Sequence, residues 1–279
     1  MDLAKQIRSA IERGELLEHY QPKVDLFGGN IIGAEALVRW RHPTHGLLGP
    51  SRFLPLAEQY GLVGSLGVSM RTAVARFAAH VNHTRQCALR FAVNASVLEL
   101  TQPDYLASTA RILGQHQCDP AWLTIEVTES VRGDDDPRLL NTLRGLRAMG
   151  VGVALDDFGT GYSCLARLLD WPLTEIKIDR GFVRHLETSS ARQAIVRHTI
   201  CIAEQLGLSV VAEGIEAQAQ RSVLAQMGCR EGQGFLFGRP QDARAFRALL
   251  AQGAVTAPAL RPCSGLPPAA ILTDHAGPS

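Results

Sequence analysis

Short apolar runs alternate with longer amphipathic stretches along most of this chain of 279 residues. The runs are rich in Val, Ile and Leu and stop at turn-forming or acidic residues, which is typical of buried strands. The stretches between them repeat apolar residues at helical spacing, as Leu3, Ile7 and Ile11 do. Strands that alternate with helices predict an α/β fold in which right-handed crossovers join parallel strands.

The pattern predicts eight strands, near positions 20, 35, 91, 125, 154, 177, 211 and 234. The first two, residues 19–26 and 31–40, are separated only by the turn Gly28-Gly29-Asn30 and should pair antiparallel. Eight strands favour a closed (β/α)8 TIM-like barrel with an antiparallel first strand over an open sheet. The barrel should occupy residues 1–253, and the Ala/Pro-rich residues 254–279, which lack periodicity, should form a poorly ordered tail.

Local signals predict where three of the helices begin. Ser51 is the expected N-cap of one helix. Ser96 and Glu99 have the spacing of a capping box at the start of another. Asp136 and Pro137 supply an N-cap acid and a first-turn proline to the third.

Composition excludes several classes of protein. Apolar residues make up 46% of the chain and charged residues 20%, so a sizeable core is expected. The formal net charge of +1 argues against a general binder of nucleic-acid duplexes or membrane surfaces, but it allows a small anionic ligand. The six cysteines show no Cys-x-x-Cys spacing, so reduced thiols are expected. Without a signal-like N-terminus or a membrane-length apolar run, a soluble, cytoplasmic chain is expected.

The most informative stretch is residues 153–163, an apolar strand that ends in Asp156 and Asp157 and runs into a glycine-bracketed loop. Neighbouring carboxylates disfavour joint ionisation unless a cation lies close to them. A solvated Asp-Asp turn closed by Gly159 would explain the pair equally well. The pair alone therefore leaves both interpretations open.

Oxygen-bearing and ammonium side chains also stand at the other predicted strand ends. In chain order they are Glu35, Asn94, Glu126, Asp156 with Asp157, Lys177 with Asp179, and Glu213. Because chemistry in such barrels sits where the carboxyl ends of the strands meet, these groups should converge at one mouth. Helix capping would explain Asp or Asn at these positions, but not Glu, a poor N-cap, at three of them.

Several carboxylates and one amide oxygen, with no Cys or His among them, indicate a hard cation, Mg²⁺ or Mn²⁺, rather than zinc. These carboxylates exceed in number what one octahedral ion needs, so two ions bridged by Asp156 are plausible. Such a pair activates water and stabilises both oxygens of a phosphoryl transfer. Lys177 could orient or deprotonate that water, or form a salt bridge to Asp179 or Asp157. Arg39 could bind a substrate phosphate with its forked guanidinium.

Several blocks of the sequence resemble the EAL domain, the bacterial cyclic di-GMP phosphodiesterase. Glu35-Ala36-Leu37 looks like its signature, and the resemblance extends from about Tyr20 to Pro240. The other matching blocks, in order, are Asn94-Ala-Ser96, Glu126-Val-Thr-Glu129, residues 156–163, Lys177-Ile-Asp179, Ala212-Glu-Gly-Ile-Glu216 and Gln233-Gly.

This resemblance implies hydrolysis of one phosphodiester of cyclic di-GMP to linear pGpG with two Mg²⁺ or Mn²⁺ ions, which lowers this second messenger in bacterial signalling. One ion would be held by Glu35, Asn94, Glu126 and Asp156. The second would be served by Asp156, Asp157 and Glu213. Lys177 would position the water, so the catalytic group would comprise Glu35, Lys177, Asp157 and Glu213.

The resemblance also assigns residues around this centre. The substrate groove would be lined by Gln21, Leu37, Arg39, Asp179, Gln233 and Pro240. Glu129 resembles the acid that steadies the loop after Asp157, and Glu216 looks like a further supporting acid. Because that loop commonly joins the dimer interface in the family, a homodimer is implied. Two residues depart from the family pattern, Cys164 in place of a serine and Lys23 in place of an apolar residue, and we expect them to tune the loop and the rim.

Two alternatives to this enzyme remain. A non-catalytic receptor would bind cyclic di-GMP and signal through a partner, but such members generally lose metal ligands, and every ligand is retained in this sequence. A barrel enzyme that acts on another phosphate ester is weaker, because the groove residues match the family as well as the metal ligands do.

Overall fold

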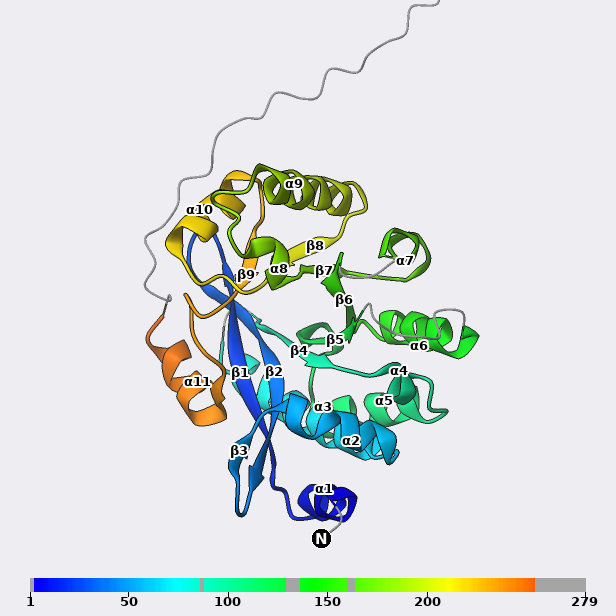
Figure 1. The fold of residues 1–279 in the computed structure, drawn as a ribbon. Coiled ribbons are helices and arrows are strands. Elements are labelled where there is room, and N and C mark those ends of the chain that lie inside the picture. Colours follow the sequence, from blue (N-terminus) through cyan, green and yellow to red (C-terminus); the bar gives the residue numbers. More distant parts are fainter. Residues whose placement is uncertain (1–2, 86–87, 129–135, 160–163, 254–279) are drawn as a thin grey trace, which may run out of the picture.

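The computed structural model describes residues 3–85, 88–128, 136–159 and 164–253 (Figure 1). The predicted tail lies outside them. The strands of the described part are β1 (Leu16–Asp25), β2 (Ile31–His42), β3 (Gly46–Leu48), β4 (Arg90–Asn94), β5 (Leu123–Thr128), β6 (Gly152–Phe158), β7 (Glu175–Ile178), β8 (Ser209–Ala212), β9 (Glu231–Gln233) and β10 (Gln241–Asp242).

Helices follow most of these strands. The longer ones are α1 (Leu3–Glu12), α3 (Val63–Asn82), α5 (Tyr105–Gln115), α6 (Pro137–Ala148), α9 (Ser190–Gln205), α10 (Gln218–Gln226) and α11 (Ala243–Ala251). The short helical segments are η1 (Pro50–Arg52), α2 (Leu54–Gln59), α4 (Val97–Leu100), η2 (Pro120–Trp122), α7 (Cys164–Asp170) and α8 (Arg180–Val183). No helix in the described part of the chain is long and apolar enough to cross a membrane.

Eight of the described strands close a barrel, as predicted. Strands β2, β4, β5, β6, β7, β8 and β9 pair with one another in that order, all parallel. Strand β1 pairs antiparallel with both β2 and β9 and so completes the ring. The (β/α)8 TIM-like fold with an antiparallel first strand is therefore confirmed. The remaining strands, β3 and β10, pair with β2 and β1 respectively.

The strand register carries predicted site residues to the carboxyl ends of the parallel strands. Asn94, the last residue of β4, lies beside Glu126 of β5. Across the antiparallel pair, Gln21 of β1 lies opposite Glu35 of β2. The antiparallel strand thus contributes to the same mouth as its parallel neighbours.

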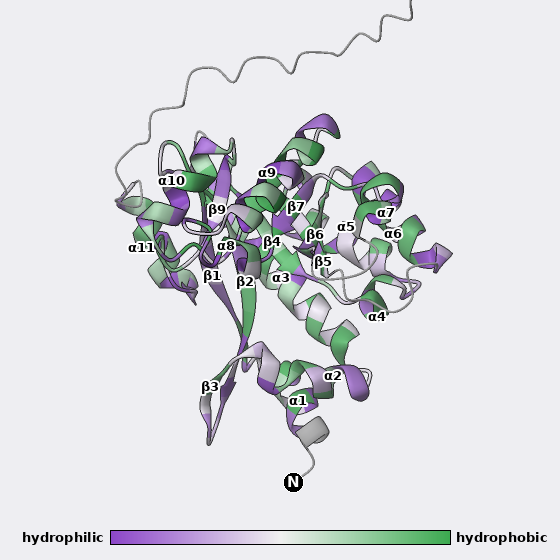
Figure 2. Cartoon of the chain, turned by 45° about the horizontal axis from the view of Figure 1, so that its top comes forward, coloured by the Kyte–Doolittle hydropathy of each residue, from purple (hydrophilic) through white to green (hydrophobic). Residues whose placement is uncertain are grey.

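Apolar helix faces cover the outside of the barrel, and Figure 2 shows that the helices carry both polar and apolar stretches. In α9 the buried positions are Val196, Thr199, Ile200 and Ala203, the spacing of one helix face. Rings also join helices to strands, because Tyr20 of β1 stacks on Phe77 of α3 with centroids 4.2 Å apart. A buried ring of this kind contributes about 1.5–3 kcal/mol, so these contacts hold β1 firmly against the helical layer.

Two of the three predicted helix starts are found. The Ser96 hydroxyl accepts the Glu99 N–H, and the Asp136 carboxylate accepts the Arg138 N–H. The prediction for Ser51 was wrong, since this residue lies inside η1 and α2 begins later, at Leu54. A helix capped by Ser51 would place Pro55 where a backbone N–H must be donated, and proline has none.

Candidate active site

The carboxyl ends of the strands surround a cavity of about 540 Å³. The predicted site residues that line it are Gln21, Glu35, Leu37, Asp156, Asp157, Lys177, Asp179, Glu213, Glu216 and Gln233. A second hollow of about 360 Å³, with a mainly apolar lining, adjoins it at Glu35 and Leu37 and includes Asn94. The structure therefore gathers most of the predicted residues at one mouth.

Lys177 lies at the centre of this mouth, with only 1% of its side chain exposed. Four carboxylates surround its ammonium. The Nζ atom lies 2.7 Å from Glu213 Oε1, 2.9 Å from Glu126 Oε2, 3.1 Å from Asp156 Oδ1 and 3.5 Å from Glu35 Oε2. A single positive charge cannot balance four carboxylates, so the mouth is electrostatically suited to additional cations.

Burial and crowding separate the pKa values of these carboxyl groups. Burial raises the pKa of Glu35, but Lys177 and the amide of Gln233 outweigh it and hold this pKa at about 2. Burial, with the nearby charge of Glu35, raises the pKa of Glu126 to about 8. Burial also raises the pKa of Glu213 to about 7 despite its contact with Lys177. A bound divalent cation would offset this unfavourable negative charge.

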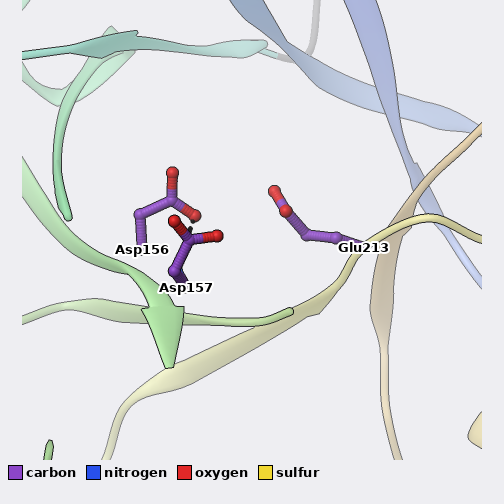
Figure 3. Close-up of side chains that lie close together, drawn as sticks. All are labelled: Asp156, Asp157 and Glu213. Atoms are coloured by element: carbon purple, nitrogen blue, oxygen red, sulfur yellow. Dashed lines mark hydrogen bonds between the residues drawn. The ribbon is translucent and has the colours of Figure 1, made fainter. Parts of the chain in front are cut away.

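Asp156 and Asp157 both reach the mouth because β6 is irregular at this point. Neighbouring strand residues normally point to opposite faces. Here Leu155 pairs with Ile176 and Phe158 pairs with Ile178. The two aspartates of β6 that lie between these pairs therefore stand opposite a single residue of β7, Lys177, as in a β-bulge. Asp157 also takes a φ of 55°, in the left-handed region. Its carboxylate consequently lies beside that of Asp156 (Figure 3).

Glu213 completes a cluster with these two aspartates. Each of these three residues has a carboxylate oxygen that lies within 4.8 Å of the corresponding oxygens of the other two. Figure 3 shows the Glu213 carboxylate facing the aspartates. Oxygens this close repel one another unless a cation binds between them. Carboxylate oxygens are the ligands that Mg²⁺ and Mn²⁺ prefer, so the donor set fits the predicted hard cation.

Glu35 is oriented by two amide side chains. Asn94 Nδ2 donates to Glu35 Oε1 at 2.8 Å, and Gln233 Nε2 donates to Glu35 Oε2 at 2.5 Å. Gln233 also donates to Gln21 Oε1 at 3.2 Å. Because the nitrogen of Asn94 is used by Glu35, the oxygen of Asn94 is the atom that remains for a cation.

Other predicted residues lie away from the mouth cavity or at its edge. Arg39 and Pro240 are not among the described residues that line it, and the Arg39 guanidinium donates to the Val38 carbonyl at 2.9 Å. Asp179 lines the cavity, and its carboxylate also caps α8 by accepting the Gly181 N–H. Glu129 lies outside the described residues.

The prediction that Lys23 lies at the rim was wrong, because this residue is buried in the barrel with 4% of its surface exposed. Its Nζ lies 3.0 Å from Glu126 Oε1 and 2.8 Å from Glu175 Oε1. Lys23 follows Gln21 by two residues on β1, so its side chain points to the same inward face. Glu175 was missed altogether, although its position two residues before Lys177 on one strand could have revealed it.

Comparisons with known proteins agree with this geometry. The EAL domain family model matches residues 4–240. MucR of Pseudomonas aeruginosa, named a bifunctional diguanylate cyclase/cyclic di-GMP phosphodiesterase, is 42% identical over 251 residues, which are 90% of this chain and 37% of MucR. A second protein of that bacterium, named a cyclic di-GMP phosphodiesterase, is 41% identical over 222 residues, 79% of this chain and 38% of its own. The chain thus spans well under half the length of these relatives.

Solved structures are similar as well. A P. aeruginosa MucR phosphodiesterase in complex with c-di-GMP superposes with a TM-score of 0.81 at 42% identity, covering 88% of this chain and 100% of the other. The EAL domain of Mycobacterium smegmatis DcpA gives a TM-score of 0.73 at 34% identity, covering 87% and 98% respectively.

Proposed function

The chain belongs to the EAL domain family, and on this premise we propose that it is a phosphodiesterase that hydrolyses cyclic di-GMP to linear pGpG. In a bacterial cell this reaction would lower the concentration of the second messenger. The four carboxylates around Lys177 support the proposal most directly, because they form a strongly anionic centre at the mouth of the barrel. The names of the two P. aeruginosa relatives support it as well.

We assign two metal positions to this mouth. The first would use Glu35, Asn94, Glu126 and Asp156, and the second would use Asp156, Asp157 and Glu213. Bound Mg²⁺ or Mn²⁺ would supply an activated water and stabilise negative charge on the phosphoryl oxygens. The close approach of the Asp156, Asp157 and Glu213 oxygens supports the second position, and Asp156 would be the ligand common to both.

Lys177 would orient the attacking water and balance charge around it. Its ammonium is buried and fixed by several carboxylates, so it has little freedom to leave the mouth. The water oxygen would form the new bond to phosphorus while the bond to the 3′ oxygen breaks. The departing 3′ oxygen would take up a proton, which leaves pGpG with a 5′ phosphate and a 3′ hydroxyl.

The substrate would extend from this centre over the cavity walls. Gln21, Leu37, Asp179 and Gln233 line the cavity and can contact it directly. Arg39 and Pro240 would contact the outer part of the dinucleotide. Glu129 and Glu216 would support the surrounding loops.

We also propose a homodimer that works in the cytoplasm. Leu165 and Leu169 leave 59% and 78% of their surface exposed on α7, close to the loop that the family uses for pairing. Burying two such leucines against a second copy would be favourable. Leu165→Glu with Leu169→Glu should shift a dimer toward monomer in sedimentation velocity, and an unchanged mass would contradict this interface.

Incubation of the purified protein with cyclic di-GMP tests the activity. We expect pGpG to form with Mg²⁺ or Mn²⁺, to stop with EDTA, and to resume when the metal is restored, as resolved by chromatography. Glu35→Ala, which removes a proposed ligand, is the matched inactive control. Tight nucleotide binding without turnover under either metal would instead favour a non-catalytic cyclic di-GMP receptor.

A further inference from the structure

Charged side chains continue from the mouth through the interior of the barrel. Lys23 contacts Glu126 on the side facing away from the mouth, and Glu175 follows Lys23. Lys23 and Glu175 are only 4% and 3% exposed. Beyond Glu175, Arg90 Nη1 lies 4.0 Å from the second Glu175 oxygen, and Arg90 Nη2 forms an ion pair with Glu231 at 2.5 Å. These side chains form what we call the charged column, which runs Lys177, Glu126, Lys23, Glu175, Arg90 and Glu231.

The charged column links the two ends of the barrel. Glu175, Arg90 and Glu231 are each the first residue of their strand, whereas Glu126 and Lys177 lie nearer the carboxyl ends. Arg90 leaves 42% of its side chain exposed, so the column ends at the surface opposite the mouth. Barrel interiors are usually filled by branched apolar side chains, and buried ion pairs seldom stabilise more than such packing would. Simple filling of space therefore gives no reason for a lysine at position 23.

The two oxygens of Glu126 have different partners. Oε1 lies 3.0 Å from Lys23 Nζ, on the side of the column, and Oε2 lies 2.9 Å from Lys177 Nζ, on the side of the mouth. Glu126 is completely buried, so bulk solvent does not reach either oxygen. Lys23 is itself held by Glu175 at 2.8 Å. Lys23 and Glu175 consequently set the orientation of the Glu126 carboxylate from the side facing away from the mouth.

We propose that Lys23 is a positioning residue that holds Oε1 of Glu126, so that Oε2 alone is presented to a cation in the mouth. Glu175 fixes Lys23 in this task. The inference rests on the proposed function only for the assignment of Glu126 as a metal ligand. Groups behind a ligand of this kind typically change metal affinity by about 10- to 100-fold when they are removed.

The charged column offers a matched pair of double variants. Lys23→Met with Glu175→Gln removes the Lys23–Glu175 ion pair together with the contacts of Lys23 to Glu126 and of Glu175 to Arg90. Arg90→Gln with Glu231→Gln removes the Arg90–Glu231 ion pair and the contact of Arg90 to Glu175, and leaves Lys23 in contact with Glu126. Each double variant leaves the net charge of the column unchanged, so a difference between them does not arise from a lost charge. Mn²⁺ affinity is measured by electron paramagnetic resonance without nucleotide, after thermal unfolding in EDTA has established that each variant folds.

We expect Mn²⁺ to bind about 10- to 100-fold more weakly to the Lys23/Glu175 double variant and within about twofold of the parent to the Arg90/Glu231 double variant. Equal Mn²⁺ affinity in the parent and both variants would overturn the proposal, as would equal weakening in both variants. A purely structural role would lower the unfolding temperature and leave the affinity unchanged.

A third variant covers the case in which the Lys23/Glu175 double variant does not fold. Glu175→Gln alone retains Lys23 but removes the carboxylate that holds it, and it should weaken Mn²⁺ binding more than Glu231→Gln does, which removes the same charge at the far end of the column. Equal Mn²⁺ affinity in these two single variants would overturn the proposal. A parent protein that binds Mn²⁺ but does not cleave cyclic di-GMP would refute the proposed function, whereas the comparison of affinities would still decide the role of Lys23.

Discussion

The backbone N–H of Asp157 donates a hydrogen bond to Oδ1 of Asp156, 2.9 Å away, and thereby joins two neighbours that a regular strand would point apart. The φ of 55° at Asp157 makes this arrangement possible. Left-handed backbone costs roughly 1–2 kcal/mol for most residues, and Asp and Asn tolerate it best. The irregular end of β6 thus places a second carboxylate in the mouth at a modest cost in stability.

Asp157→Asn should separate stability from catalysis. Burial and the charge of Asp156 raise the pKa of Asp157, so its ionised form destabilises the metal-free fold. Asparagine keeps the backbone preference but removes the charge, so urea unfolding in EDTA should show equal or greater stability. Turnover with Mg²⁺ should fall by more than about 100-fold, because a proposed ligand is lost.

Asp170→Asn is the control for this variant, since Asp170 is exposed at the end of α7. It removes the same charge away from the mouth and should leave both measurements unchanged. Near-parental turnover of Asp157→Asn would exclude Asp157 from the metal ligands.

The sequence predicted the shared mouth but not the mechanism that brings both aspartates into it. Strand ends can be counted along a sequence, and so Glu126 and Lys177 were placed together correctly. A local shift of register depends on contacts between β6 and β7, which period-2 alternation does not encode. Lys23 was misplaced for a related reason, because a charged residue is expected at the surface unless its buried partners are known in advance.

Lys177→Met should weaken the metal-free protein but strengthen its metal binding. Removal of the ammonium leaves four carboxylates without their shared partner, which should cost about 3–5 kcal/mol of unfolding free energy in EDTA. The same loss removes a competitor for these oxygens, so Mn²⁺ should raise the unfolding temperature more than it does in the parent. Turnover should nevertheless fall by roughly 10²–10⁴, because no group positions the water.

Arg197→Met serves as the control for charge loss, since Arg197 is exposed on α9. It should leave the unfolding temperature with Mn²⁺ and the turnover near the parental values. If Lys177→Met lowered only the affinity for cyclic di-GMP, with the rate at saturation retained, the proposed role in placing water would be wrong.

Glu213 should make the metal-free protein less stable as pH rises. Burial raises its pKa to about 7, above the ordinary value of 4.5. A carboxyl with a raised folded pKa stabilises the fold below its unfolded pKa, and this contribution is lost as pH rises through about 7. Glu213→Gln should therefore stabilise the protein more at pH 8 than at pH 5, by on the order of 2 kcal/mol. Urea unfolding in EDTA at the two pH values measures the difference.

Mn²⁺ binding should depend on the same titration of Glu213, with an affinity that rises as pH rises. Because a ligand must lose its proton, Mn²⁺ affinity should increase between pH 6 and pH 8, with proton release detectable by calorimetry in buffers of different ionisation enthalpy. Glu187→Gln, at an exposed position, should alter neither result. A stability gain for Glu213→Gln that is equal at pH 5 and pH 8 would contradict the assignment of this titration to Glu213.

Gly234 should tolerate no side chain, because a Cβ atom at this position would collide with the backbone of Ile215. The two backbones are held together by the hydrogen bond from Ile215 N–H to the Gln233 carbonyl at 3.1 Å, so neither can retreat cheaply. Gly234→Ala should cost roughly 1–3 kcal/mol in urea unfolding. It should also slow turnover, since Gln233 orients Glu35. Gly114→Ala in α5 is the control, because a Cβ atom there meets no atom within 4 Å. It should stabilise the protein by roughly 0.5–1 kcal/mol. Equal effects of the two substitutions on the unfolding free energy would show that the close approach of Gly234 to Ile215 is unimportant.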